Sequence, residues 1–184
     1  MKMKNGIGIL SMLLVLATAA PAQADVITIN FKDSGLFNGG PIGSPSSPAG
    51  AVWATATFAD NGSNHVTLTM SVNPALGGTH QYVNEWYFNV SAPLVSWSNT
   101  SPPAATGNPS VEYGNNCCSL GPSPNFDLRF NFNTNDPGNL AQGLTSVYEI
   151  IGTNLTANSF LTYSGNFLAA VKVQGDGASF DVKG

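Results

Sequence analysis

"FDLRFNF", residues 126–132, alternates apolar and polar side chains without a break. A β-strand points successive side chains to opposite faces, so this segment has one apolar face and one polar face. Strands of this kind are typical of antiparallel sheets that bury one face and leave the other in water. The same alternation occurs in "VITINF" (26–31), "HVTLTMSV" (65–72) and "EWYFNV" (85–90). The sequence therefore predicts an all-β protein.

Turn-forming residues separate the predicted strands. "DNGSN" (60–64) joins a strand expected over 50–59 to the strand over 65–72. Asn-Gly favours a tight hairpin, and a calcium loop would need a later carboxylate that this segment lacks. About ten short strands, each with one apolar face, predict an antiparallel two-sheet sandwich of jelly-roll-like type, with a barrel as the alternative. Further strands are expected over 145–151, 159–164, 167–174 and 178–182, and long Gly/Pro/Ser-rich loops over 34–50 and 98–125.

The N-terminus has the pattern of an export signal. Lys2 and Lys4 precede an apolar run over 7–20, and Ala22-Gln23-Ala24 supplies the small residues of a cleavage site. The run is shorter than the roughly 20 apolar residues of a membrane-spanning helix. We therefore expect a secretory signal peptide over 1–24 and a single domain over 25–184. The mature protein is expected to be extracellular or at the cell surface, without insertion in the membrane.

The charge balance excludes one class of partner. Removal of Lys2 and Lys4 would leave four basic residues against ten acidic ones, which is a net charge of −6. Proteins that bind the nucleic-acid backbone need a basic patch or stripe, so no nucleic-acid partner is expected. Only 9% of the residues are charged, so amide and hydroxyl groups must solvate most of the surface.

Several stretches resemble exported bacterial proteins that carry PEP-CTERM sorting signals. They are "VWATATFADNGSNHVTLTMSVN" (52–73), "VNEWYFNVS" (83–91), "YEIIGTNLTANSF" (148–160) and "AAVKVQGDGASFDVKG" (169–184). The resemblance implies export by a Gram-negative bacterium and a part in surface coats, extracellular polysaccharide or biofilm. The family's C-terminal signal, a Pro-Glu-Pro motif with an apolar helix and a basic tail, has no counterpart in the sequence. The family also offers no catalytic residues that could be carried over to this sequence.

Both cysteines are adjacent, in "NNCCSL" (115–120). An exported protein meets an oxidising compartment, where disulfides form. Three states remain open for Cys117 and Cys118: a ring that joins them to each other, thiols that are free or bridged to another molecule, and a metal site. The Cα atoms of neighbouring residues are closer than in most disulfides, so a ring would be strained. Zinc sites prefer cysteines two to four residues apart, so no metal is predicted.

No catalytic motif is present. The sequence has no Gly-x-Ser-x-Gly elbow, no His-Glu-x-x-His motif and no Walker loop, and its only histidines are His65 and His80. No spacing singles out a pair among the carboxylates Glu85, Glu112, Asp127, Asp136 and Glu149. We therefore predict no catalytic residues, no cofactor and no enzymatic activity.

Aromatic side chains are the remaining functional candidates. Sugar-binding sandwiches stack exposed rings on pyranose faces, and Tyr87, Trp97 and Trp53 are the candidates for such stacking, whereas alternation places Trp86 in the core. The leading hypothesis is a non-catalytic surface or matrix protein that acts by self-association or coating, since unpaired strand edges can template assembly. The alternative is a polysaccharide-binding module that uses exposed aromatic side chains.

Overall fold

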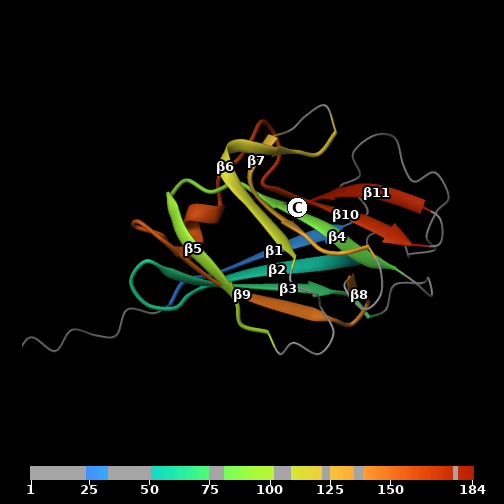
Figure 1. Cartoon of the computed structure of the whole chain (residues 1–184), viewed down its shortest axis with the longest axis horizontal. Helices are drawn as coiled ribbons and strands as arrows, with labels where there is room; N and C mark the ends of the chain where they lie inside the picture. Colours follow the sequence, from blue (N-terminus) through green and yellow to red (C-terminus); the bar gives the residue numbers. More distant parts are fainter. Residues whose placement is uncertain are drawn as a thin grey trace, which may run out of the picture.

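The computed structural model describes residues 24–32, 51–74, 81–101, 109–121, 125–134, 139–175 and 178–184, and confirms the predicted two-sheet sandwich (Figure 1). All paired strands are antiparallel. The five-stranded sheet has the order β1 (Val26–Lys32), β2 (Val52–Asp60), β3 (His65–Val72), β9 (Thr145–Gly152) and β5 (Leu94–Asn99). The six-stranded sheet has the order β11 (Ala178–Lys183), β10 (Ala169–Gly175), β4 (Tyr82–Phe88), β7 (Asn125–Asn131) and β6 (Ser110–Ser119), and the short β8 (Leu140–Ala141) also pairs with β4.

The core lies between the two sheets and is formed by the predicted apolar faces. Large rings from both sheets meet there: Phe31 packs edge-on against Trp86 with ring centroids 5.5 Å apart, and Phe58 stacks on Phe160 at 4.1 Å. The alternation of "FDLRFNF" is confirmed, because Leu128 and Phe130 are buried in this core while the polar residues between them are half-buried. Burial of these rings is the main favourable term for the fold.

The predicted hairpin between β2 and β3 is confirmed. The Asn61 amide donates to the His65 carbonyl oxygen at 2.9 Å, which closes the turn. Gly62 and Asn64 have φ angles of 96° and 68°, in the left-handed region that Gly and Asn tolerate best.

Three sequence-based expectations about secondary structure are wrong. The loop expected over 98–125 contains β6, and β5 was not predicted as a strand. The strand expected over 159–164 is instead the short 3-10 helix η2 (Ala157–Phe160) followed by irregular chain. This helix forms because Thr156 and Ser159 make a capping box and the Asp60 carboxylate accepts the Ala157 amide at 2.6 Å.

The outer faces of the two sheets differ in chemistry. On the five-stranded sheet, register-paired hydroxyl side chains form rows across the strands, such as Thr28, Thr57 and Thr69. On the six-stranded sheet, the corresponding outward positions carry charges. Asp181, Lys172 and Glu85 form one row, and Arg129 pairs with Glu112 in another.

Some predictions lie outside the described residues. These are the signal peptide up to residue 23, the loop over 34–50, His80 and Asp136. Within the described part of the chain, no helix has the length and apolar character needed to cross a membrane.

Candidate functional site

The side of the sandwich between β5 and β6 carries an aromatic pair. These strands are the edges of the two different sheets and lie on the same side of the molecule, at the left of Figure 1. Trp97 on β5 and Tyr113 on β6 meet in an edge-to-face arrangement with ring centroids 6.3 Å apart. The Leu94 amide donates to the Tyr113 hydroxyl at 3.0 Å, which links the two sheets. We call this pair and the two hollows beside it the side groove.

The first hollow of the side groove has a volume of about 300 Å³ and is lined by Trp97, Asn99, Pro109, Val111 and Tyr148. Trp97 keeps 37% of its surface exposed, whereas Tyr148 is buried. Burial raises the pKa of Tyr148 to about 12, and a hydrogen bond from Asn99 acts in the opposite direction. The hollow therefore combines an accessible indole with an amide and a neutral phenol.

The second hollow has a volume of about 180 Å³ and is lined by Tyr113 of the aromatic pair. Its polar groups come from Ser91, Asn115 and Asp127, and Tyr113 forms its aromatic wall. Asp127 is held in place because its carboxylate accepts two backbone amides, from Asn116 at 2.9 Å and from Val90 at 3.2 Å. These bonds join the β6 segment to the chain that leads from β4 to β5.

A bulge in β6 places Asn115 at the second hollow. Tyr113 pairs with Leu128 and Cys118 pairs with Phe126, so the four residues from Gly114 to Cys117 stand opposite the single residue Asp127. Asn116 has a φ of 51°, which is left-handed and turns the chain within the bulge. Bulges often re-aim side chains next to functional sites, and this one turns an edge strand into part of a groove.

The structure closes Cys117 and Cys118 into a disulfide at the end of this bulge, with Cα atoms 3.7 Å apart. Cys117 is exposed, whereas Cys118 is only 2% exposed. No free cysteine remains.

Two of the three predicted stacking residues are wrong, because they are buried. Trp53 is 2% exposed and belongs to the main core. Tyr87 points away from that core, as the alternation predicts, but it is only 1% exposed. A second, smaller core covers it, formed with Cys118, Leu120, Phe126 and Ala170. Burial raises the pKa of Tyr87, whose hydroxyl also donates to the Glu85 carboxylate.

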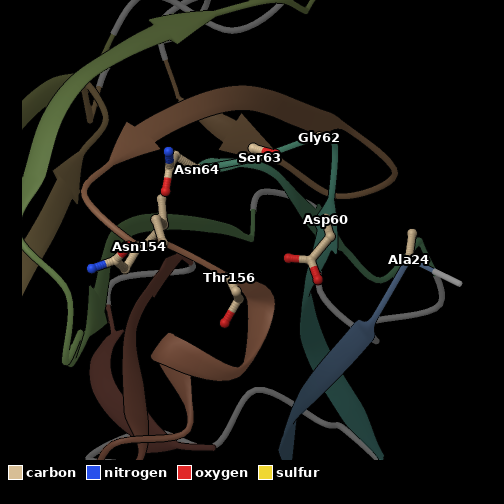
Figure 2. A pocket seen from close by; sticks show the side chains of 8 residues that line it. Ala24, Asp60, Gly62, Ser63, Asn64, Asn154 and Thr156 are labelled. Atoms are coloured by element: carbon tan, nitrogen blue, oxygen red, sulfur yellow. The ribbon is translucent and has the colours of Figure 1, made fainter. Parts of the chain in front are cut away.

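A separate cavity of about 530 Å³ lies at one end of the sandwich, and we call it the end cleft (Figure 2). It lies between the β2–β3 turn and the segment that follows β9. Figure 2 shows Asp60 between Ala24 on one side and Thr156 and Asn154 on the other. Among the described residues, no aromatic side chain lines the cleft, which is formed by Ala24, Asp60, Gly62, Ser63, Asn64, Asn154, Leu155 and Thr156. It offers hydrogen bonds but no ring on which a sugar could stack.

Several of the histidine and carboxylate side chains considered in the sequence have partners within the fold. His65 Nδ1 lies 2.8 Å from the Glu149 carboxylate across β3 and β9. Glu112 pairs with Arg129, and Asp127 accepts the backbone amides described above. Within the described ranges, no group of three or more His, Cys, Asp or Glu side chains gathers in an arrangement that could hold a metal ion.

Sequence reasoning found Trp97 but missed its neighbours. Tyr113, Asn99 and Asn115 lie in the stretch for which the sequence predicts a loop, and no sequence pattern gives Asp127 a partner. A signal for Tyr113 does exist, since Val111, Glu112 and Tyr113 alternate as a strand does.

Comparisons with models of protein families, with curated proteins and with solved structures found no match to this chain.

Proposed function

We propose that this is a non-catalytic exported protein that binds extracellular polysaccharide along the side groove. The observation that carries the proposal is the half-exposed Trp97, paired with Tyr113 between two hollows that present amides and a carboxylate. A ring face covers the apolar side of a sugar, and amide and carboxylate groups bond its hydroxyls. Binding sites commonly combine such an apolar wall with a few fixed polar groups.

The position of the first strand supports export. The first residue of β1 is Val26, directly after the predicted cleavage position at Ala24 and Asp25. Cleavage there would leave the whole sandwich intact. The predicted mature charge is small and negative, which suits an uncharged ligand better than an acidic one.

Binding is tested with insoluble cellulose and chitin in pull-down assays and with soluble xylan and β-glucan in affinity electrophoresis. We expect at least one of these to retain the mature protein. Trp97→Ala should weaken binding about tenfold or more, because truncating a hot-spot Trp costs about 2 kcal/mol or more and 1.4 kcal/mol is a factor of ten. Tyr163→Ala is the matched control, since Tyr163 is a 65% exposed aromatic residue that does not line the groove.

Tryptophan fluorescence gives a second readout. The chain has three tryptophans, of which Trp53 and Trp86 are buried, so a solute quencher should reach mainly Trp97. Bound polysaccharide should protect Trp97 from quenching. The proposal fails if no polysaccharide of the panel binds, or if Trp97→Ala binds as the unaltered protein does.

Self-association is a second candidate function, favoured by the β1 edge. Among the described strands, β1 pairs only with β2, and Val26–Phe31 contains no charge, proline or glycine. Uncharged edges of high β-propensity template the addition of further strands. This function would suit a coat or matrix protein of the kind that the sequence resembles.

The test replaces one residue on this edge. Thr28→Lys places a charge on β1, and we expect it to abolish any concentration-dependent rise in mass measured by light scattering. Thr69→Lys is the control, because Thr69 lies in the same row on the central strand β3. Equal masses for all three proteins at every concentration would contradict edge association.

A further inference from the structure

The disulfide between Cys117 and Cys118 lies at an unusual place for a structural cross-link. It joins neighbouring residues, so it closes almost no loop and removes little conformational entropy from the unfolded chain. It also lies on the edge strand β6, at the end of a bulge that other contacts already hold. The Asn116 amide donates to the Asp127 carboxylate at 2.9 Å, a contact that involves neither sulfur atom.

The two halves of the disulfide have opposite environments. Cys117 is exposed, beside the exposed Asn115 and Asn116. Cys118 is buried in the second core with Tyr87, Leu120 and Phe126. A molecule arriving from solvent can therefore reach the Cys117 side chain but not the Cys118 side chain.

We propose that this disulfide is a site of covalent modification at which Cys117 accepts an external thiol by thiol–disulfide exchange. An external thiolate attacks Cys117 Sγ, the bond to Cys118 Sγ breaks, and a mixed disulfide forms at Cys117. Cys118 leaves as a thiolate and takes up one proton from solvent. One disulfide replaces another, so the step needs no oxidant or reductant.

The small second core favours attack at Cys117 Sγ with Cys118 Sγ as the leaving group. A protonated Cys118 thiol behaves as a small hydrophobic group, so it can stay among Tyr87, Leu120 and Phe126 after the bond opens. The chain has only two cysteines and neither is free, so the attacking thiol must come from a different kind of molecule. Exposed disulfides that contribute little to stability are the exchangeable ones.

The experiment incubates the native mature protein with reduced glutathione, quenches it with acid, and caps new thiols with a maleimide after unfolding. We expect a species with one glutathione and one capped thiol, and peptide mapping should place glutathione on Cys117. Glutathione on Cys118, or an adduct that forms only in denaturant, would overturn the proposal.

Two single variants check the direction independently. With Cys118→Ser the remaining Cys117 thiol is exposed, and with Cys117→Ser the remaining Cys118 thiol is buried. The native Cys118→Ser protein should react with a chromogenic disulfide at least about tenfold faster, because a buried thiol reacts only after local opening. Equal rates in two folded variants would overturn the proposal. Polysaccharide binding is not a readout here, so the inference and the proposed function fail separately.

Discussion

Replacement of Asp127 by alanine tests whether one carboxylate holds the side groove together. The carboxylate accepts the Asn116 amide at 2.9 Å and the Val90 amide at 3.2 Å, and it is half-buried between β7 and the bulge. Hydrogen bonds to a charged group contribute about 1.5–3 kcal/mol each, but water can replace the bond to the exposed Asn116. We therefore expect Asp127→Ala to lower the free energy of unfolding by about 2–3 kcal/mol.

Thermal unfolding, monitored by circular dichroism, measures this loss of stability. For a domain of this size, each 1 kcal/mol shifts Tm by about 2–4 °C, so the expected decrease is about 5–10 °C. Asp127→Asn keeps the shape and one acceptor oxygen, and its decrease should be about half as large. Hydrogen exchange should show faster exchange of the Asn116 and Val90 amides in the alanine variant. Unchanged protection of both amides, or a Tm within about 1 °C of the unaltered protein, would refute the reasoning.

Three further predictions concern stability. Burial raises the pKa of Asp181 above its value in the unfolded chain, although Lys172 opposes the shift. The charged form of Asp181 therefore destabilises the fold at neutral pH, so Asp181→Asn should raise Tm at pH 7. At lower pH the Asp181 carboxyl is protonated, and thermal denaturation should show that the gain in Tm disappears. Phe58→Ala removes a fully buried ring and should cost about 3–5 kcal/mol in urea unfolding. Gly152→Ala would bring a Cβ atom to 2.6 Å from the Pro93 carbonyl oxygen, so purified protein should unfold at clearly lower temperature.

The alternation of apolar and polar residues predicted the core well, because neighbouring strands of a sheet share the same two-residue alternation. In "FDLRFNF" every apolar residue is buried: Leu128, Phe130 and Phe132 lie in the core between the sheets, whereas Phe126 belongs to the second core. The same rule misjudged Tyr87, because periodicity tells which face a side chain occupies and not whether another segment covers that face. The second core brings Cys118, Leu120 and Phe126 together with Tyr87 and Ala170, which are distant from them in sequence, and no local pattern indicates that contact.

The candidate site was harder to predict because some of its residues lie on irregular backbone. The bulge after Tyr113 breaks the alternation of β6, and its Asn and Gly residues favour a turn when read locally. Only the pairing with β7 shows that this segment continues a strand. Trp97 was singled out by its residue type alone, and its partner Tyr113 becomes a neighbour only when the edges of the two sheets meet.

The contrast between the two outer sheet faces has an electrical consequence. Asp181, Lys172 and Glu85 lie in one row on the six-stranded sheet, whereas the Thr28, Thr57 and Thr69 row on the other sheet carries no charge. Dissolved salt screens interactions between exposed charges over about 10 Å at 0.1 M ionic strength, and it has little effect on hydroxyl contacts. Ionic strength should therefore change the interactions of the charged row on the six-stranded sheet more than those of the Thr28, Thr57 and Thr69 row on the five-stranded sheet.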